Sequence, residues 1–260
     1  MRDPGRSIES TLIGGGTVLA FLALWELAPA LGLIDPLFIS SPVRVGRAGY
    51  ELFATGEIWP DIEVSAAAFF WGYLLSIAIG VPLGLAIGLS RRVGYALGPV
   101  VDALNAVPRI TLLPLIVIWA GIGIWSKIAV VFLGAVIPIA IYTWSGVKTS
   151  EARFTRVARS FGASRAKIFS SLILPGTLPF IFTGLKYGAG RALLGVVVGE
   201  LYASTAGVGH MIAQAGNALQ ADIVFFGVLL FTAAGLTMVG LLSAVERRFE
   251  RWRPPAGGAR

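Results

Sequence analysis

Four ionisable side chains of this sequence lie inside long apolar stretches, where charges are rare. They are Glu26, Lys186, Arg191 and Glu200. A charge in the hydrocarbon core of a membrane is costly, so it usually faces the interior of a helix bundle or an aqueous path. These residues are therefore candidates for a proton relay, for a solute pathway or for structural pairs between helices. In the structural alternative, Arg191 pairs with Glu26 or with another acid.

The chain has few side chains that could bind a metal and none that could act as a thiol. Its 260 residues include no Cys and a single His, His210. This composition excludes disulfides, thiolate nucleophiles and cysteine metal sites, and it leaves no histidine cluster for zinc or iron. The sequence also lacks paired carboxylates and a G-x-S-x-G motif, which disfavours a membrane enzyme. We expect no metal, no bound cofactor and no catalytic residue in this chain.

The segment from Thr149 to Pro175 has the pattern of two short helices that meet at a glycine. Gly162 can adopt the left-handed conformation that ends a helix, and Ser164 can cap the helix that follows. The second helix has an apolar side and two basic residues, as a surface-bound amphipathic helix would also have. We expect the Leu174-Pro175 step to end this second helix.

The elements that position these residues follow from composition. Hydrophobic residues make up 56% of the chain, charged residues 13%, and the mean hydropathy is +0.80. An ordinary soluble domain carries about 25% charged residues, so the chain belongs in a bilayer. A spanning helix needs about 20 mainly apolar residues. Six stretches qualify: Thr11–Leu33, Val64–Ser90, Ile110–Ile124, Ile128–Val147, Leu178–Ala203 and Ile223–Val245.

We therefore predict an all-α integral membrane protein with six transmembrane helices in one transmembrane domain, residues 1–260. Its core spans about 64–245, an extra N-terminal span covers 11–33, and the loop between the fourth and fifth spans covers 148–177. Pro36–Glu63 is predicted to contain a short helix that lies on the membrane surface. Pro108 is expected to end an amphipathic piece over Leu97–Val107 before the third span.

Basic residues are divided unequally between the two sides of the predicted bundle. Fifteen Lys and Arg residues fall in segments 1–10, 91–92, 148–167 and 247–260, against Arg44, Arg47 and Lys127 on the other side. An excess of Lys and Arg marks the cytoplasmic side of a membrane protein. Both termini and the loop 148–177 are therefore predicted to be cytoplasmic. The charges flank apolar runs instead of forming a basic stripe, so we expect no nucleic-acid partner.

Small residues recur at every fourth position of the second span. They are Gly72, Ser76, Gly80, Gly84 and Gly88. Such a stripe lets two helix backbones approach closely in a membrane, where apolar burial does not drive association. We predict that this face of the second span packs against another helix.

The glycine loop resembles the EAA loop of bacterial ABC importer permeases, in which E-A-A is followed by three residues, G, nine residues and I-x-L-P. Here Ala158 stands at the second A, Gly162 at the G, and Leu172, Leu174 and Pro175 at the end of the motif. The chain departs from the motif at its start, where Arg156 and Val157 stand at the E and the first A. The helix, glycine and helix pattern is kept.

The resemblance extends over most of the chain and is to the nitrate, sulfonate and taurine branch of these permeases. Its marks are Ser41-Pro42, Gly88–Arg91, Val107–Arg109 before Leu112–Leu115, Trp119–Gly123 before Ser126–Ile128, Gly199–Leu201, Gly207–Gly209, Glu246–Arg248 and Trp252-Arg253. It implies a type I importer permease of the bacterial inner membrane that carries a small, anionic solute. Nitrate, taurine, alkanesulfonates, bicarbonate, aromatic acids and vitamin precursors remain open as substrates.

The resemblance also implies partners. Two permease chains, expected to be a homodimer, would form the path across the lipid, two cytoplasmic ATPase subunits would bind the ATP, and an extracytoplasmic binding protein would deliver the solute. The chain has no Gly-Lys pair and so no P-loop of its own. The residues implied to contact the ATPase are Ala158, Arg159, Gly162, Ala163, Ser164, Leu172, Leu174 and Pro175.

A proton-coupled secondary transporter is the alternative function. It would use Glu26, Lys186, Arg191 and Glu200 as a proton relay. Such transporters usually contain inverted repeats, and the glycine loop has no second copy in the sequence. The importer permease is the favoured interpretation.

Overall fold

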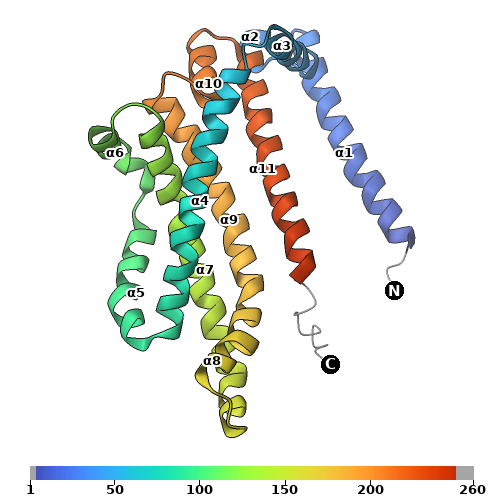
Figure 1. Ribbon diagram of the computed structural model, residues 1–260. Helices are drawn as coiled ribbons and strands as arrows, with labels where there is room; N and C mark the ends of the chain where they lie inside the picture. Colours follow the sequence, from blue (N-terminus) through green and yellow to red (C-terminus); the bar gives the residue numbers. More distant parts are fainter. Residues whose placement is uncertain (1–3, 250–260) are drawn as a thin grey trace.

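The computed structural model describes residues 4–249, apart from the side chains of residues 4–11, 36, 109, 151–157 and 159, and it contains helices but no strand in that part of the chain. The elements in chain order are α1 (Pro4–Ala30), α2 (Pro36–Ile39), α3 (Pro42–Thr55), α4 (Trp59–Leu89), α5 (Arg91–Ala106), the 3-10 helix η1 (Arg109–Leu112), α6 (Leu113–Ala120), α7 (Ile124–Ser160), α8 (Arg165–Ile168), the π-helix η2 (Phe169–Ile173), α9 (Leu174–Ala203), α10 (Val208–Asn217) and α11 (Ala221–Phe249). Long helices run side by side, and short ones lie at their ends (Figure 1).

Five helices within the described range are long and apolar enough to cross a membrane. They are α1 over Leu12–Ala30, α4, α7 over Ile124–Ser150, the continuous helical run Arg165–Ala203, and α11. This confirms an all-α membrane protein with five of the six predicted spans as continuous helices.

The predicted third span is not a single helix. The structure has α5 and the segment Ile110–Ala120, which pass the same test only together and are bent by 87° at the break between them. The expectation of a helix over Ile110–Ile124 was wrong, because α6 has eight residues and reaches only about 12 Å. The break falls at Pro108, which has no N–H to donate and follows Val107 in an extended conformation. Pro108 thus ends the amphipathic helix, as predicted, and the bent pair of α5 and Ile110–Ala120, called the broken span here, takes the place of the predicted third span.

Helix α7 lies at the centre of the bundle, between α4 and α9. The small-residue stripe of α4 faces it, which confirms the predicted packing. A Cβ at Gly80 would lie 2.9 Å from the carbonyl oxygen of Val136. Ser76 donates a hydrogen bond to the carbonyl oxygen of Phe132 at 3.1 Å. The two backbones are close because the stripe has almost no side-chain volume.

The end of the bundle that carries Gly162 is called the elbow end here. There, α7 continues without a break to Ser160, so the first of the two predicted short helices is the end of a 37-residue helix. The expected stop at Leu174-Pro175 is also wrong, since helical structure runs on from Arg165 to Ala203. The wider turns of η2 come directly before Pro175. A π-type turn makes room for a proline ring and its missing donor within a continuous helix.

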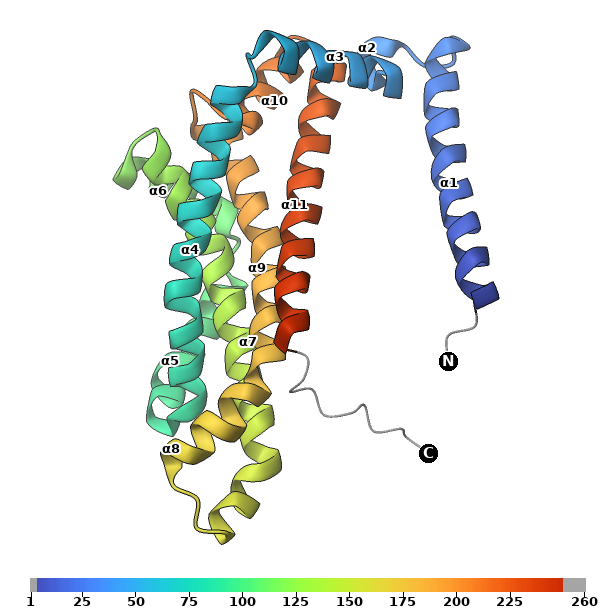
Figure 2. The ribbon, with the colours of Figure 1, turned by 45° about the vertical axis from the view of Figure 1, so that its right-hand side comes forward.

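The opposite end carries α2, α3 and α10 and is called the α3 end here. Helix α3 lies across the long helices, as Figure 2 shows, so the short helix predicted within Pro36–Glu63 is present; residues from Trp59 onward belong to α4. The carboxylate of Glu26 in α1 accepts hydrogen bonds from the Ser41 hydroxyl and the Val43 N–H, both at 3.0 Å. It therefore caps the first turn of α3 from another helix.

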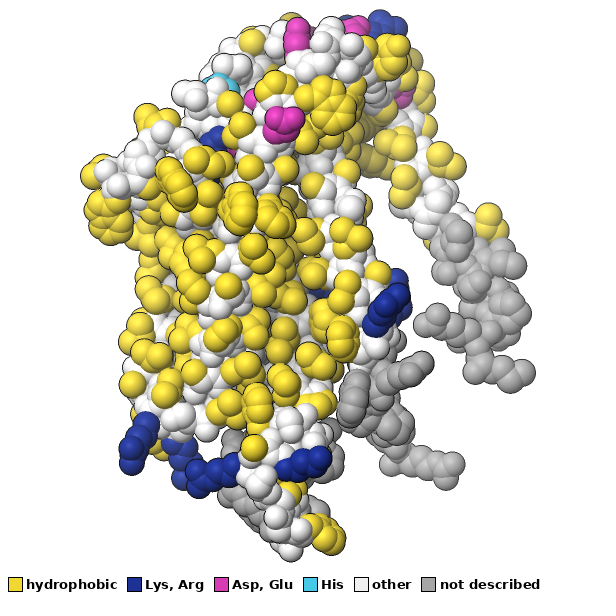
Figure 3. All heavy atoms as spheres, viewed as in Figure 1, with side chains coloured by type: hydrophobic (Ala, Val, Ile, Leu, Met, Phe, Trp, Pro, Cys, Tyr) yellow, Lys and Arg dark blue, Asp and Glu magenta, His cyan; other side chains and the backbone are white. Residues whose placement is uncertain are grey.

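Charge is distributed along the bundle in the way that the sequence predicts. In Figure 3, a group of Lys and Arg side chains lies at the elbow end, Asp and Glu side chains gather at the α3 end with a few basic ones, and hydrophobic side chains cover the middle. Helix α1 begins, and α11 ends, toward the elbow end (Figures 1 and 2). The two ends of the described chain thus lie on one side, as an even number of spans requires.

Candidate functional site

The predicted elbow has the local structure expected from its residues. Gly162 is left-handed, with φ of +75°, and the N–H of Ala163 donates to the carbonyl oxygen of Ala158 at 3.1 Å. This bond is the six-residue closure of a Schellman turn. Ser164 then caps α8 by accepting a hydrogen bond from the N–H of Lys167 at 3.3 Å. The reversal of the chain takes only residues 161–164.

The elbow is joined to the membrane helices by a small apolar core. Ile168 and Ile173 are buried against Val147 of α7, and Leu172, Ala158, Ala163 and Leu85 of α4 pack around them. The side chains of Leu174 and Pro175 are half-buried in the first turn of α9. A displacement of α8 would therefore be passed on to α4, α7 and α9 through direct contacts.

The tip of the elbow is open. Phe161 is 86% exposed, and a Cβ at Gly162 would meet no other atom within 4 Å. Phe161 was not among the predicted contact residues, although an aromatic residue just before the glycine of a reversal is a signal that could have identified it. The side chain of Arg159, which was among them, lies outside the described residues.

A cavity of about 370 Å³ lies where the broken span meets α7 and α9. The break contributes Asn105 and Pro108, α7 contributes Gly134, and α9 contributes Tyr187 and Arg191. Arg191 donates a hydrogen bond from Nη2 to the Tyr187 hydroxyl at 2.6 Å. Its guanidinium carbon lies 5.1 Å from the centre of the Tyr187 ring, within the range of a cation–π contact.

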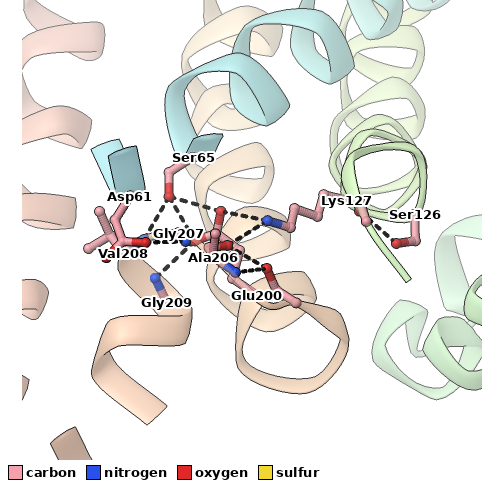
Figure 4. Close-up of polar contacts among 11 residues, drawn as sticks. Asp61, Ser65, Ser126, Lys127, Glu200, Ala206, Gly207, Val208 and Gly209 are labelled. Carbon is pink, nitrogen blue, oxygen red and sulfur yellow. Dashed lines mark hydrogen bonds and ion pairs between the residues drawn. The ribbon is translucent and has the colours of Figure 1, made fainter. Parts of the chain in front are cut away.

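Glu200 has a different environment, although it is nine residues further along α9. It is completely buried and accepts hydrogen bonds from the Ser65 hydroxyl at 2.8 Å and from the Gly209 N–H at 2.9 Å. Lys127 Nζ lies 3.7 Å from its Oε1 and donates to the carbonyl oxygen of Ala206 at 2.7 Å. Figure 4 shows these groups pointing toward one another from α4, α7, α9 and the start of α10.

The same network explains the glycines that follow α9. Gly207 has φ of +121°, and a Cβ there would press directly on the carboxylate of Glu200. Its N–H donates to Asp61 Oδ1 at 2.6 Å, and the N–H of Val208 donates to Ser65 Oγ at 2.9 Å. Sequence reasoning missed Asp61, Ser65 and Lys127, because only the fold brings their helix ends together. We call Asp61, Ser65, Lys127, Glu200 and the N–H groups of residues 207–209 the Glu200 network.

The four intramembrane charges do not form one chain of contacts. Glu26 caps α3, and Lys186 pairs with Glu246 of α11 at 2.5 Å, with both side chains partly buried. The suggested pairing of Arg191 with Glu26 is not found. Among the described side chains, the ion pairs are Lys127–Glu200 and Lys186–Glu246. Arg191 is the one of the four predicted charges that lines the cavity.

Residues 80–251 match the family described as "Binding-protein-dependent transport system inner membrane component". The chain is 36% identical to the taurine transport system permease protein TauC of Escherichia coli K12, over 91% of this chain and 88% of the relative. It is 31% identical to the putative aliphatic sulfonates transport permease protein SsuC of Bacillus subtilis 168, over 97% and 91%.

The fold is similar to that of a chain in an inward-facing structure of the MetNI methionine ABC transporter. The TM-score is 0.55 at 19% identity, with 71% of this chain and 94% of that chain covered. The likeness therefore concerns the fold alone. The family match and the curated relatives together answer the question of function class, because they cover most of the chain. This chain belongs to the inner-membrane components of binding-protein-dependent transport systems, and it is the permease subunit of an ABC transporter.

Proposed function

We propose that this permease imports a small sulfonate, and that the Gly162 elbow is the part on which a cytoplasmic ATPase acts. The exposed elbow, anchored by its apolar core to the spans, is the observation that carries the coupling proposal. The substrate class is supported by the relatives named for taurine and aliphatic sulfonates. The solute therefore carries a tetrahedral, negatively charged sulfonate group.

The elbow suits a docking role for physical reasons. An exposed Phe161 side chain on a cytoplasmic tip is costly in water, and burial in a partner's groove would remove that cost. Gly162 leaves open space beside it, so a partner surface could approach the backbone closely. A surface-lying helix would instead point its apolar side at lipid. Here the apolar residues Ile168 and Ile173 face α7 and are already buried.

The proposed partners bind the ATP and deliver the solute. Because the sequence holds no Gly-Lys pair, the nucleotide site belongs to other chains, and two ATPase subunits would bind ATP beneath two copies of the permease. An extracytoplasmic binding protein would present the solute at the α3 end. A proton-coupled transporter is not favoured, because three of the four intramembrane charges are held in separate contacts: the cap on α3, the Lys186–Glu246 pair and the Glu200 network.

This assignment requires the elbow end to face the cytoplasm, together with both termini. The segregated charge supports that orientation. The natural chain has no Cys, so single cysteines can be placed freely. An impermeant thiol reagent added to intact cells should label Asn217→Cys and not Ser164→Cys. The reverse pattern would invert the topology and overturn the proposal.

The substrate class is tested with the complete transporter in proteoliposomes, assembled with its own ATPase and binding protein. We expect ATP-dependent uptake of taurine or a short alkanesulfonate, and little uptake of β-alanine, in which a carboxylate replaces the sulfonate of taurine. If ATP-dependent uptake of every sulfonate tested is absent, the sulfonate assignment is wrong.

A further inference from the structure

Arg191 lies on the face of α9 that lines the cavity. Tyr187, Arg191, Leu194 and Val198 all line the cavity. Their spacing of four, three and four residues places them along one stripe of an α-helix. The opposite wall is the broken span, including Asn105. Arg191 is thus presented to an open space between helices and not to the packed core.

The depth of Arg191 excludes an ordinary interfacial role. It lies 12 residues before the end of α9 at Ala203 and 17 residues after Leu174. At 1.5 Å per residue these positions are about 18 Å and about 26 Å away. The hydrocarbon core of a bilayer is about 30 Å thick, so the guanidinium lies at the depth of the lipid tails. A lipid headgroup at the membrane surface is too far away to be its partner.

The charge of Arg191 is not compensated by an acid of this chain among the described side chains, since both ion pairs there involve other residues. Its contacts are the hydroxyl and the ring of Tyr187. An uncompensated cation at this depth is costly unless it faces an aqueous path or meets an anion. The cavity provides that space.

We propose that Arg191 and Tyr187 form a transient binding site for the sulfonate group of the solute as it crosses the membrane. This inference rests on the proposed function for its substrate class. A guanidinium presents a planar fork of N–H donors that can contact two sulfonate oxygens at once. Since the Tyr187 hydroxyl accepts its hydrogen bond from Arg191, its own proton remains available to donate to a third oxygen.

The remaining cavity wall explains why such a site would release its ligand. Most of the other lining residues are apolar or glycine, including Pro108, Gly134, Leu194 and Val198. Among the described side chains, Arg191 is the cation that lines this cavity. A cation without a surrounding cage lowers the barrier for an anion in the membrane and holds it only weakly. Conduction requires binding that is favourable enough for entry and weak enough for exit.

The local electrostatic effect can be measured with two thiol reagents of similar size and opposite charge. Leu194 lines the cavity and is 47% exposed, so Leu194→Cys places a reporter one turn from Arg191. The complete transporter in nanodiscs, where both sides are accessible, is treated with 2-sulfonatoethyl methanethiosulfonate or its trimethylammonium analogue. The anionic reagent itself carries an ethanesulfonate group.

We expect the ratio of the anionic to the cationic modification rate to fall roughly tenfold when Arg191→Gln is added to Leu194→Cys. The anionic reagent loses its attraction to the guanidinium, and the cationic reagent loses its repulsion from it. Lys186→Gln is the matched control and should leave the ratio unchanged. An unchanged ratio with Arg191→Gln would overturn the site. This is also the result expected if an acid of the second permease chain neutralises the charge of Arg191. Failure of both reagents to modify Leu194→Cys would also overturn it, since the cavity would then be dry.

Transport separates this inference from the proposed function. Arg191→Gln should lose at least about nine-tenths of ATP-dependent sulfonate uptake, and Arg191→Lys should keep part of it, while ATP hydrolysis stimulated by the binding protein remains. If the wild-type transporter takes up sulfonate and Arg191→Gln does so equally well, only the Arg191 site is wrong. If the wild-type transporter takes up none, the sulfonate assignment and the site both fail.

Discussion

The two ends of the bundle use their polar and apolar residues in opposite ways. At the α3 end, the completely buried carboxylate of Glu200 is surrounded by donor groups from three other helices, α4, α7 and α10. At the elbow end, Phe161 is 86% exposed and the glycine beside it has open space around it. The first arrangement fixes how the helix ends meet. The second leaves a surface that has no partner within the described chain, and the contrast separates a structural network from a docking surface.

The largest expected effect is on the Glu200 network. Glu200→Leu leaves Lys127 buried without its carboxylate and leaves the Gly209 N–H without an acceptor. Breaking a buried pair in this way costs about 3–5 kcal/mol of stability. Thermal unfolding of the purified protein in detergent should show a lower midpoint and poor recovery of folded protein. Glu57→Gln, an exposed acid at the same end, should change the midpoint little; equal effects of the two variants would contradict the structural role.

The next effect is expected at the elbow tip. Phe161→Ala should weaken binding of the ATPase by about 2 kcal/mol, the size typical of a central aromatic contact, or roughly 30-fold in affinity. The thermal midpoint of the isolated permease should not fall, because the side chain has few contacts within the chain. The measurement is co-purification of the ATPase over a salt series. Ala166→Ser, also exposed on α8, is the control, and an equal loss with both variants would argue against a specific role for Phe161.

A smaller effect distinguishes the backbone conformation at Gly162 from the size of the side chain there. Gly162 has φ of +75°, a conformation that costs a residue with a Cβ about 1–2 kcal/mol, whereas Asn tolerates it better. Gly162→Ala should therefore reduce ATPase co-purification by about 5- to 30-fold, and Gly162→Asn by less. If Asn impairs assembly as strongly as Ala does, side-chain bulk and not backbone conformation decides the effect.

The smallest effect is expected for the pair between α9 and α11. Lys186 and Glu246 are 27% and 16% exposed, against 3% and 0% for Lys127 and Glu200, so this pair is less completely buried and its contribution should stay at about 1 kcal/mol. A double-mutant cycle with Lys186→Gln and Glu246→Gln, read from thermal midpoints, gives the coupling. A coupling above about 2 kcal/mol would instead give this pair a structural role like that of the Glu200 network.

The sequence predicted those features that arise within one helix or one turn. The stripe from Gly72 to Gly88, the end of α5 before Pro108 and the turn at Gly162 each depend on residues close in the chain. The membrane location and the segregation of charge also follow directly from the composition and from the positions of the basic residues. Local signals were enough for these features.

Two kinds of feature could not be predicted in the same way. Ile110–Ile124 is apolar enough for a span, yet the crossing in the structure begins with α5. Because α5 has a polar face, its average hydropathy is low, and a search for apolar stretches does not find it. The Glu200 network joins Asp61, Lys127 and Glu200, which are far apart in sequence and meet only because three helices end at one place. Charges within apolar stretches therefore indicated important positions, but only the fold separated the exposed Arg191 from the buried Glu200.

The most direct test of the central claim is site-specific crosslinking from the elbow tip in the assembled transporter. A benzophenone attached to Phe161→Cys, in a chain that has no other Cys, is irradiated in nanodiscs. The same reagent on Asn217→Cys at the α3 end serves as the control. We predict a crosslink to the ATPase subunit from residue 161 and none from residue 217. Crosslinks from residue 161 to lipid alone would contradict the account, because the elbow would then be a membrane-surface helix.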